Sequence, residues 1–374
     1  MNKKLWIIIA VIAIVAAIAL AFSPRRAPMP ASDKPVVKIA ALYPMSGDAA
    51  IYGDASRKVI EAFLSEWESN NPNARYKYEV HFEDVQLSTQ KAVTAMQRIA
   101  LNDEADAIMN ILSSISLAIN PITDKYRIIN INYTLDPATS SGDYAFRLAT
   151  DVKLAIGKLV SRLQNQGVKK IALVASNDVS GNILYEEIIR QMKAQDKVAL
   201  GPTFRINPGE KNFDVIIQKI KQSDADMLIL EALPPESDLF FIAMKRNNLR
   251  IPATAYQTLG TLKDKSLAEG MWEINDVSAS PEWIEKYSKV LGGTDTYYSD
   301  ATYTMLNVLI NAWEKADTEP GQRPTKESVV KSMKKNTAGL KTPLGTLQTD
   351  EEGDILMSIV VREIQNGIPV VIKE

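Results

Sequence analysis

The side chains that most often carry out catalysis are scarce in this sequence. It contains no cysteine and one histidine, His81. Thiolate nucleophiles, cysteine-ligated zinc and disulfide bonds are therefore excluded, and a single imidazole cannot build a multi-histidine metal site. Neither the glycine-rich nucleotide-binding motifs nor the G-x-S-x-G nucleophile motif occurs. We therefore expect a protein that binds a ligand without transforming it, and not an enzyme.

Carboxylates are the remaining reactive groups, and they occur in two clusters. Asp103-Glu104-Ala105-Asp106 and Asp350-Glu351-Glu352 do not follow predicted strands. A carboxylate-only calcium loop is the one metal hypothesis that stays open. Against it, the second cluster lacks the twelve-residue ligand spacing of an EF-hand loop. We interpret both clusters as solvated surfaces or turns, and we expect no metal or other cofactor.

Length and charge limit the class of protein further. The chain has 374 residues, with 43 Lys or Arg against 45 Asp or Glu and a net charge of −2. Without a basic block, nucleic acid is not an expected partner, because phosphate contacts need clustered cations. At roughly 150 residues per domain, the length suggests two globular domains.

The N-terminus predicts export from the cytoplasm. Lys3 and Lys4 precede an uncharged apolar run, Leu5–Phe22, which at ~1.5 Å per residue is just long enough to cross a bilayer as a helix. Two interpretations stay open: an anchor retained in the cytoplasmic membrane, or a signal peptide cleaved near Ala19-Leu20-Ala21. Residues 23–35 contain four prolines and are expected to form an extended spacer.

An alternation of short apolar strands and amphipathic helices begins at Val36. In the first half we expect strands at Val36–Tyr43, Tyr78–Phe82, Ala107–Leu112 and Ile128–Tyr133, with helices at Ile60–Trp67, Ser88–Asn102 and Ser116–Tyr126. The rhythm restarts with a helix at 154–163, and strands follow at Lys170–Ser176, Gly201–Ile206 and Met227–Leu230, with helices at Ile183–Met192, Phe213–Ile220 and Leu239–Met244. Such a pattern predicts parallel α/β sheets covered on both faces.

The C-terminal part departs from this alternation. A long helix at Tyr303–Trp313 is followed by expected strands at Gly345–Gln348, Leu356–Ile364 and Pro369–Ile372. Asn366-Gly367 between the last two strands is a typical hairpin turn. The ending therefore predicts a hairpin that packs on one of the two lobes.

Several motifs along the exported part resemble the leucine/isoleucine/valine-binding family, the type I substrate-binding proteins of ATP-driven importers. The resemblance rests on five stretches in the family's order: Lys38–Gly47 with Tyr52-Gly53, Asp84 with Gln90–Val93, Pro208–Phe213 with Asp224-Ala225-Asp226, Tyr298-Ser299-Asp300-Ala301, and Leu344–Leu347 through Gly353-Asp354.

The resemblance implies a Venus-flytrap fold of two doubly wound, Rossmann-like α/β lobes joined by three crossovers. We place the crossovers near Leu148–Asp151, Asn275–Ala279 and Lys341–Leu344. Lobe I then comprises residues 36–148 plus 279–341, and lobe II comprises 149–278 plus 342–374, after a leader (1–22) and the spacer (23–35). The ligand is expected between the lobes, because open α/β sheets bind ligands beyond the carboxyl ends of their strands.

The resemblance also implies which lobe I residues contact the ligand. The loop Ser113-Ser114-Ile115-Ser116 corresponds to the family's carboxylate-binding serine loop, at a helix N-terminus that favours an anion. Thr134 matches a donor after the fourth strand, and Tyr52 matches a ring that walls the pocket, with Ser46 as a weaker candidate. The alternative for Ser113 and Ser116 is a helix-capping role.

Lobe II departs further from the family pattern. Ser180-Gly181 stands where Tyr-Gly is common, and Gln257, beside Tyr256, falls near the acidic residue that binds the ligand ammonium. An amide exchanges a charge-assisted hydrogen bond of ~1.5–3 kcal/mol for a neutral one of ~0.5–1.5 kcal/mol. Another carboxylate is therefore needed if the ligand is an amino acid, and the candidates are Glu231, Asp178 and Asp136, each of which could instead be structural.

The function implied is capture of a small polar solute, an amino acid or an amide-like molecule, outside the cytoplasmic membrane. The implied partners are the permease and ATPase subunits of an ABC importer. The alternative hypothesis is a membrane-anchored sensor that signals through a protein partner.

Overall fold

The computed structural model describes residues 34–47, 49–276, 279–293, 296, 298–319, 322–350 and 353–373. The expected leader, residues 1–22, and nearly all of the spacer lie outside these ranges. None of the helices within them combines the length and apolar character that a membrane crossing requires.

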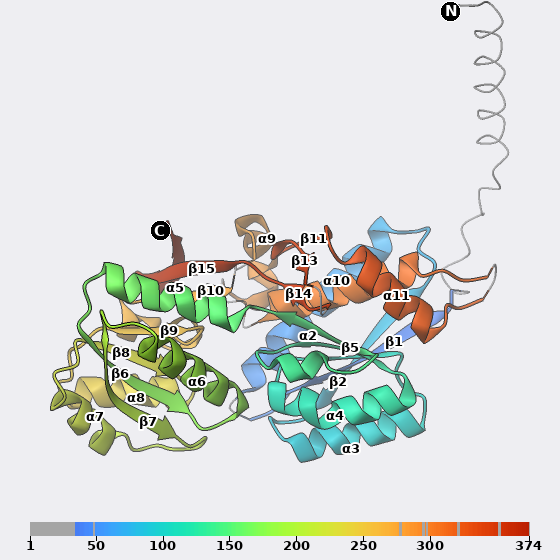
Figure 1. Cartoon of the computed structure of the whole chain (residues 1–374). Coiled ribbons are helices and arrows are strands. Elements are labelled where there is room, and N and C mark those ends of the chain that lie inside the picture. Colours follow the sequence, from blue (N-terminus) through green and yellow to red (C-terminus); the bar gives the residue numbers. More distant parts are fainter. Residues whose placement is uncertain are drawn as a thin grey trace, which may run out of the picture.

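Two α/β lobes stand side by side, each built on a seven-stranded sheet (Figure 1). The sheet of lobe I has the strand order β13-β14-β5-β4-β3-β1-β2. Its strands are β1 (Val36–Tyr43), β2 (Lys77–Asp84), β3 (Ala107–Asn110), β4 (Ile129–Tyr133), β5 (Ala145–Ala149), β13 (Gln348–Thr349) and β14 (Ile355–Leu356). All pairings in it are parallel except that of β13 with β14.

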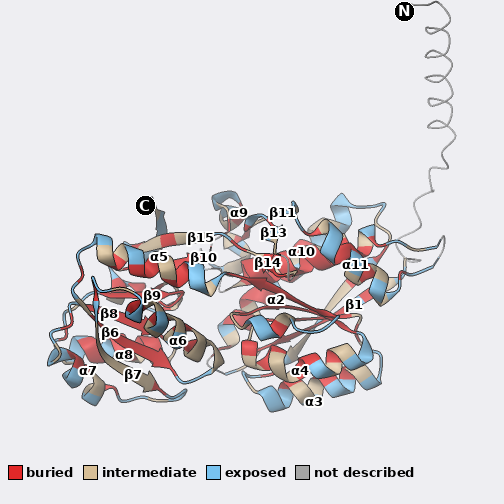
Figure 2. Cartoon of the chain, viewed as in Figure 1, coloured by how far each residue is buried: buried red, intermediate tan, exposed pale blue. Residues whose placement is uncertain are grey.

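Helices cover both faces of the lobe I sheet. One core is formed against α2 (Ala50–Asn70), α10 (Ser299–Lys315) and α11 (Lys326–Asn336), and α9 (Pro281–Leu291) packs on α2. The other core is formed against α3 (Thr89–Leu101) and α4 (Ser113–Tyr126). Every residue of β3 and β4 is buried, as expected for strands covered on both sides (Figure 2).

Lobe II repeats the topology of lobe I in its five central strands, but its two C-terminal strands pair antiparallel with their neighbours. Its strand order is β16-β15-β10-β9-β8-β6-β7, with helices again on both faces. The strands are β6 (Lys170–Ser176), β7 (Ala199–Ile206), β8 (Met227–Glu231), β9 (Ala253–Tyr256), β10 (Trp272–Asp276), β15 (Ile359–Gln365) and β16 (Ile368–Ile372). The helices are α5 (Val152–Asn165), α6 (Val179–Lys193), α7 (Asp214–Lys221) and α8 (Glu236–Arg246). The predicted pair of doubly wound lobes is therefore confirmed.

The C-terminal segment crosses between the lobes later than expected. The predicted strand Leu356–Ile364 is two strands: β14 pairs with β5 in lobe I, whereas β15 pairs with β10 in lobe II. The third crossover therefore lies between Leu356 and Ile359 and not near Lys341–Leu344, so β13 and β14 belong to lobe I. Ile355 is buried in the lobe I core. The change of sheet is concealed in the sequence because only Ser358 interrupts the apolar run 355–361.

The predicted hairpin turn at the end of the chain is present. β15 and β16 pair antiparallel across Asn366 and Gly367, whose φ angles are 54° and 72°. Two successive positive φ angles are characteristic of a type I′ turn, which asparagine and glycine tolerate best.

Candidate ligand-binding site

A cavity of about 100 Å³ lies between the two lobes, where the carboxyl ends of the central strands of both sheets meet. Lobe I contributes Ile111, Leu112, Ser113, Tyr133, Thr134, Leu135 and Tyr298. Lobe II contributes Ser176, Asp178, Ser180, Gly181, Leu184, Glu231, Ala232, Leu233, Tyr256, Gln257 and Thr258. The cavity is mostly apolar, with a few polar groups at its ends.

The N-terminus of α4 forms one end of the cavity. Ser113 is the first residue of this helix, and Leu112, in extended conformation, precedes it without a capping side chain. The N–H groups of the first turn therefore have no side-chain acceptor, and together with the helix dipole they favour an anion. Ser113 Oγ lies 3.5 Å from Ser180 Oγ, so the two lobes touch at this point.

The other two predicted serines do not line this cavity. Ser116 Oγ is buried and donates to Asn110 Oδ1 at 2.6 Å, which ties α4 to the end of β3. Ser114 is half-buried beside the cavity. Since α4 begins at Ser113, three residues before the predicted start, neither Ser113 nor Ser116 acts as its N-cap.

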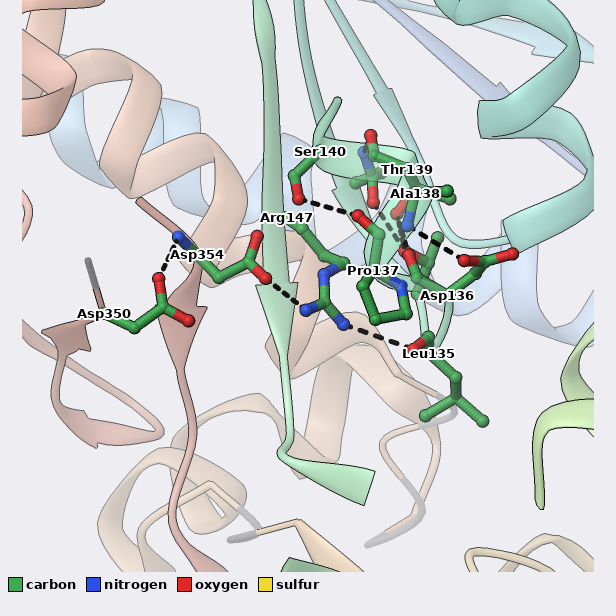
Figure 3. Close-up of polar contacts among 11 residues, drawn as sticks. Leu135, Asp136, Pro137, Ala138, Thr139, Ser140, Arg147, Asp350 and Asp354 are labelled. Atoms are coloured by element: carbon green, nitrogen blue, oxygen red, sulfur yellow. Dashed lines mark hydrogen bonds and ion pairs between the residues drawn. The ribbon is translucent and has the colours of Figure 1, made fainter. Parts of the chain in front are cut away.

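Thr134 lies in the cavity wall and is fixed by its own lobe. Its Oγ1 donates to Asn132 Oδ1 at 2.7 Å. The following residue, Leu135, also lines the cavity, and its carbonyl accepts a hydrogen bond of 3.2 Å from Arg147 Nη1 (Figure 3). Arg147 in turn pairs with the buried carboxylate of Asp354, which follows the acidic turn at Asp350. This buried ion pair therefore holds the strand end that presents Thr134.

Asp136 and Tyr52 support the site without lining it. Asp136 Oδ1 accepts from Ala138 N at 2.9 Å and caps the short helix Pro137–Ser140 (Figure 3). Tyr52 is stacked on Tyr298, with ring centroids 5.5 Å apart and an interplanar angle of 13°. Tyr298 forms the actual wall, and its ring also meets that of Tyr133 at 5.5 Å. Tyr298, which directly precedes α10, was expected from the sequence only as part of a family motif and not as a cavity residue.

The polar wall of lobe II begins at the N-terminus of α6. Asp178 lines the cavity, but both of its oxygens are occupied: Oδ1 accepts from Gly181 N at 2.8 Å and Oδ2 from Ser176 Oγ at 2.6 Å. Asp178 is thus the N-cap of α6. A Cβ on Gly181 would lie 2.3 Å from Ser176 O, so only glycine fits where α6 approaches β6.

Glu231, at the end of β8, carries the group in the site that most needs a partner. Its side chain is 2% exposed, Oε1 accepts from Tyr256 N at 2.9 Å, and Oε2 has no hydrogen-bond partner among the residues that the structure describes. Burial raises the pKa of the Glu231 carboxyl well above its usual value, and Glu273 adds to the effect. A buried carboxylate oxygen without a partner costs free energy, and such groups concentrate at functional sites.

Gln257 and Tyr256 lie in the cavity wall, with their polar ends turned to a neighbouring carboxylate. Gln257 Nε2 donates to Asp276 Oδ2 and to Tyr133 Oη, both at 2.7 Å. Tyr256 Oη donates to Asp276 Oδ1 at 2.8 Å. The Gln257 amide nitrogen is thus already hydrogen-bonded within the protein. No sequence feature predicted that Asp276 would bind these residues.

The described part of the chain contains no cluster of three or more His, Asp or Glu side chains arranged to hold a metal ion. The cavity lining brings together a helix N-terminus from lobe I, which favours an anion, a buried carboxylate from lobe II, and mostly apolar side chains. This arrangement suits binding of a small molecule that carries both charges.

Comparisons with known proteins agree with the fold. The model of the periplasmic binding protein family matches residues 36–367. The leucine-, isoleucine-, valine-, threonine-, and alanine-binding protein of Pseudomonas aeruginosa is 24% identical over 345 residues, which cover 85% of this chain and 87% of that protein.

Two solved structures share the architecture. The leucine-binding protein LivK of Thermotoga maritima has a TM-score of 0.79 at 18% identity, with 90% of this chain and 98% of that chain covered. A solute-binding protein of an ABC transporter from Rhodopseudomonas palustris, in complex with 3,4-dihydroxybenzoic acid, has a TM-score of 0.77 at 17% identity, with 90% and 96% covered.

Members of this family are substrate-binding proteins that act outside the cytoplasm, as expected from the resemblance. Because the family model extends over nearly the whole described part of the chain, the protein belongs to the periplasmic binding protein family, of the type that serves branched-chain amino acid transporters.

Proposed function

We propose that the protein captures a small aliphatic amino acid in the interlobe cavity and delivers it to an ABC importer. The observation that carries this proposal is the unpartnered Oε2 of Glu231, which lines a cavity whose other lobe presents the uncapped N-terminus of α4. An α-ammonium group would give the Glu231 carboxylate its missing partner. An α-carboxylate would accept hydrogen bonds from the first turn of α4 and from Ser113.

The size and lining of the cavity support a small apolar side chain. At roughly 10–15 Å³ for each water-sized group, a volume of this kind holds ~7–10 non-hydrogen atoms, the range of valine, isoleucine and leucine. The apolar part of its lining includes Leu112, Leu135, Leu184, Ala232 and Leu233. Their burial by the ligand contributes affinity in proportion to the apolar area removed from water.

Glu231 favours amino acids over simple carboxylic acids. The relative from Pseudomonas aeruginosa is named for five amino acids, whereas the structure from Rhodopseudomonas palustris holds an aromatic acid. An acid without an ammonium group would leave Glu231 Oε2 buried and unpaired, which costs free energy.

A ligand held at both ends also favours closure, because it contacts both lobes. A ligand shifts an equilibrium between open and closed forms only by its difference in affinity for the two. Moving the ratio from 1:99 to 99:1 requires ~5.5 kcal/mol. Contacts at α4 on one lobe and Glu231 on the other both contribute to that difference.

Isothermal titration calorimetry with a defined set of compounds tests the proposal. The set comprises leucine, isoleucine, valine, alanine, threonine, 3,4-dihydroxybenzoate and 4-methylpentanoate, which is leucine without its amino group. We expect at least one aliphatic amino acid to bind, and 4-methylpentanoate to bind at least tenfold more weakly than leucine. Preference for either of the two acids over every amino acid would refute the assignment.

A further inference from the structure

The carboxylate of Asp276 is a hub of four hydrogen bonds at the base of the cleft. Oδ2 accepts from Tyr133 Oη and Gln257 Nε2, both at 2.7 Å, and Oδ1 accepts from Tyr256 Oη at 2.8 Å and from Thr150 Oγ1. Asp276 is 4% exposed, and burial raises the pKa of its carboxyl, although the four hydrogen bonds oppose that effect. All four donors are neutral.

These donors come from separate parts of the fold. Tyr133 is the last residue of β4 in lobe I, and Thr150 directly follows β5, where the chain first crosses to lobe II. Tyr256 ends β9, and Gln257 follows it, in the same lobe as Asp276. One side chain thus connects lobe I, the first crossover and lobe II.

The Asp276 carboxylate lies behind the cavity wall and does not itself line the cavity. Tyr133, Tyr256 and Gln257 line the cavity, whereas Asp276 does not. Asp276 lines a neighbouring groove of about 1000 Å³, which Tyr133 also borders. The hydrogen bonds of Asp276 therefore fix the orientation of three cavity-wall residues from the rear.

We propose that Asp276 is a positioning residue that latches the cleft, through a hydrogen bond to Tyr133 that forms when the lobes close and breaks when they open. The bond joins the ends of strands in the two different lobes, so its length depends on how the lobes are oriented. Hydrogen bonds to a carboxylate are about twice as strong as those between neutral groups. The latch would therefore stabilise the closed form even before a ligand arrives.

The two tyrosines of the hub provide a matched pair of variants. Tyr133→Phe removes an interlobe donor to Asp276, and Tyr256→Phe removes a donor within lobe II at nearly the same distance. Each substitution deletes one hydroxyl and keeps the ring. A difference between them therefore reports on the connection between lobes and not on the loss of a buried hydrogen bond in general.

The interlobe distance can be measured directly in the ligand-free protein. The chain contains no cysteine, so the exposed residues Gln90 in lobe I and Lys211 in lobe II can be replaced by cysteine and labelled for single-molecule energy transfer. We expect Tyr133→Phe to shift the ratio of open to closed molecules towards open by at least about tenfold, because it removes the charge-assisted bond to Asp276 and also the bond that Tyr133 Oη accepts from Gln257. Tyr256→Phe should shift it less than twofold.

Equal shifts in both variants, or none in Tyr133→Phe, would overturn the latch. A melting curve of each variant confirms that the fold is retained, and Asp276→Asn should open the cleft at least as far as Tyr133→Phe. The inference rests on the proposed function only to explain what the latch is for. If no amino acid binds and Tyr133→Phe still opens the cleft, the proposed ligand is wrong and the latch stands.

Discussion

Replacing Glu231 by glutamine should weaken amino acid binding and leave the fold intact. The amide retains an oxygen that can accept from Tyr256 N, the 2.9 Å bond now made by Oε1. What is lost is the negative charge at Oε2, which has no partner in the described part of the chain. A charge-assisted hydrogen bond is worth ~1.5–3 kcal/mol, so affinity for leucine should fall by roughly 10- to 150-fold.

Calorimetry with two ligands and two proteins isolates the contribution of the bond between the ligand ammonium and Glu231. Titrating leucine and 4-methylpentanoate into the wild type and into Glu231→Gln forms a double-mutant cycle, in which only leucine brings the ammonium group. Asp238→Asn is the matched control, because Asp238 Oδ2 is also buried without a hydrogen-bond partner but lies outside the cavity. Equal losses for both ligands, or unchanged leucine affinity, would show that Glu231 does not bind the ammonium group.

The same substitution should change stability in the opposite direction. Because burial raises the folded-state pKa of Glu231, its contribution to stability is present below the unfolded pKa of about 4.3 and is lost as pH rises through the folded value. Ligand-free Glu231→Gln should therefore melt higher than the wild type at pH 7.5, and the difference should shrink towards pH 4. A variant that melts lower at pH 7.5 would contradict an uncompensated charge at this position.

Three further predictions concern the scaffold. Arg147→Ala leaves the carboxylate of Asp354 buried without its partner and should lower the free energy of unfolding by about 3–5 kcal/mol in urea titrations; the result would be contradicted by a loss below 1 kcal/mol. Gly181→Ala should cost ~1–3 kcal/mol, because its Cβ overlaps the β6 backbone, and an unchanged urea midpoint would refute this. Burial raises the pKa of Asp106, but the adjacent Lys326 ammonium and further hydrogen bonds lower it by more, so that this pKa lies below 3.8. The stabilising contribution of Asp106 is therefore lost as pH falls through that lower value. Asp106→Asn should flatten the dependence of unfolding free energy on pH below about 4, and an unchanged slope would exclude this.

The regular strands and helices of both lobes could be predicted because their signals are local. β1, β6 and β8 are runs of buried apolar residues, and the capping of α3 by Ser88 follows from the residue type, with Ser88 Oγ accepting from Lys91 N. Alternation of these elements sufficed to predict two parallel sheets.

Two of the missed strands contain buried charged residues. β5 contains Arg147, and β10 contains Glu273, so neither resembles a buried strand in sequence. Their charges are compensated by residues distant along the chain, Asp354 for the first and Arg362 for the second. Such partners become visible only once the chain is folded, and the change of sheet after Leu356 is hidden for the same reason.

In the site, too, features with a local sequence signal could be predicted, and features that depend on distant residues could not. A serine-rich stretch at the start of α4 was predictable, but which serine faces the cavity depends on Asn110, which engages Ser116. Glu231 was one of several candidate carboxylates, and its unpartnered oxygen distinguishes it from Asp178. Asp276 ends a strand with no local sign of function, because its four donors lie 19 to 143 residues away.

Small-angle X-ray scattering with and without leucine tests most directly whether the lobes close on an amino acid. The radius of gyration should decrease when leucine is added at saturating concentration. In Glu231→Gln, the decrease should require roughly 10- to 150-fold more leucine. A radius that stays constant in the wild type, with leucine and with every other aliphatic amino acid, would contradict ligand-driven closure.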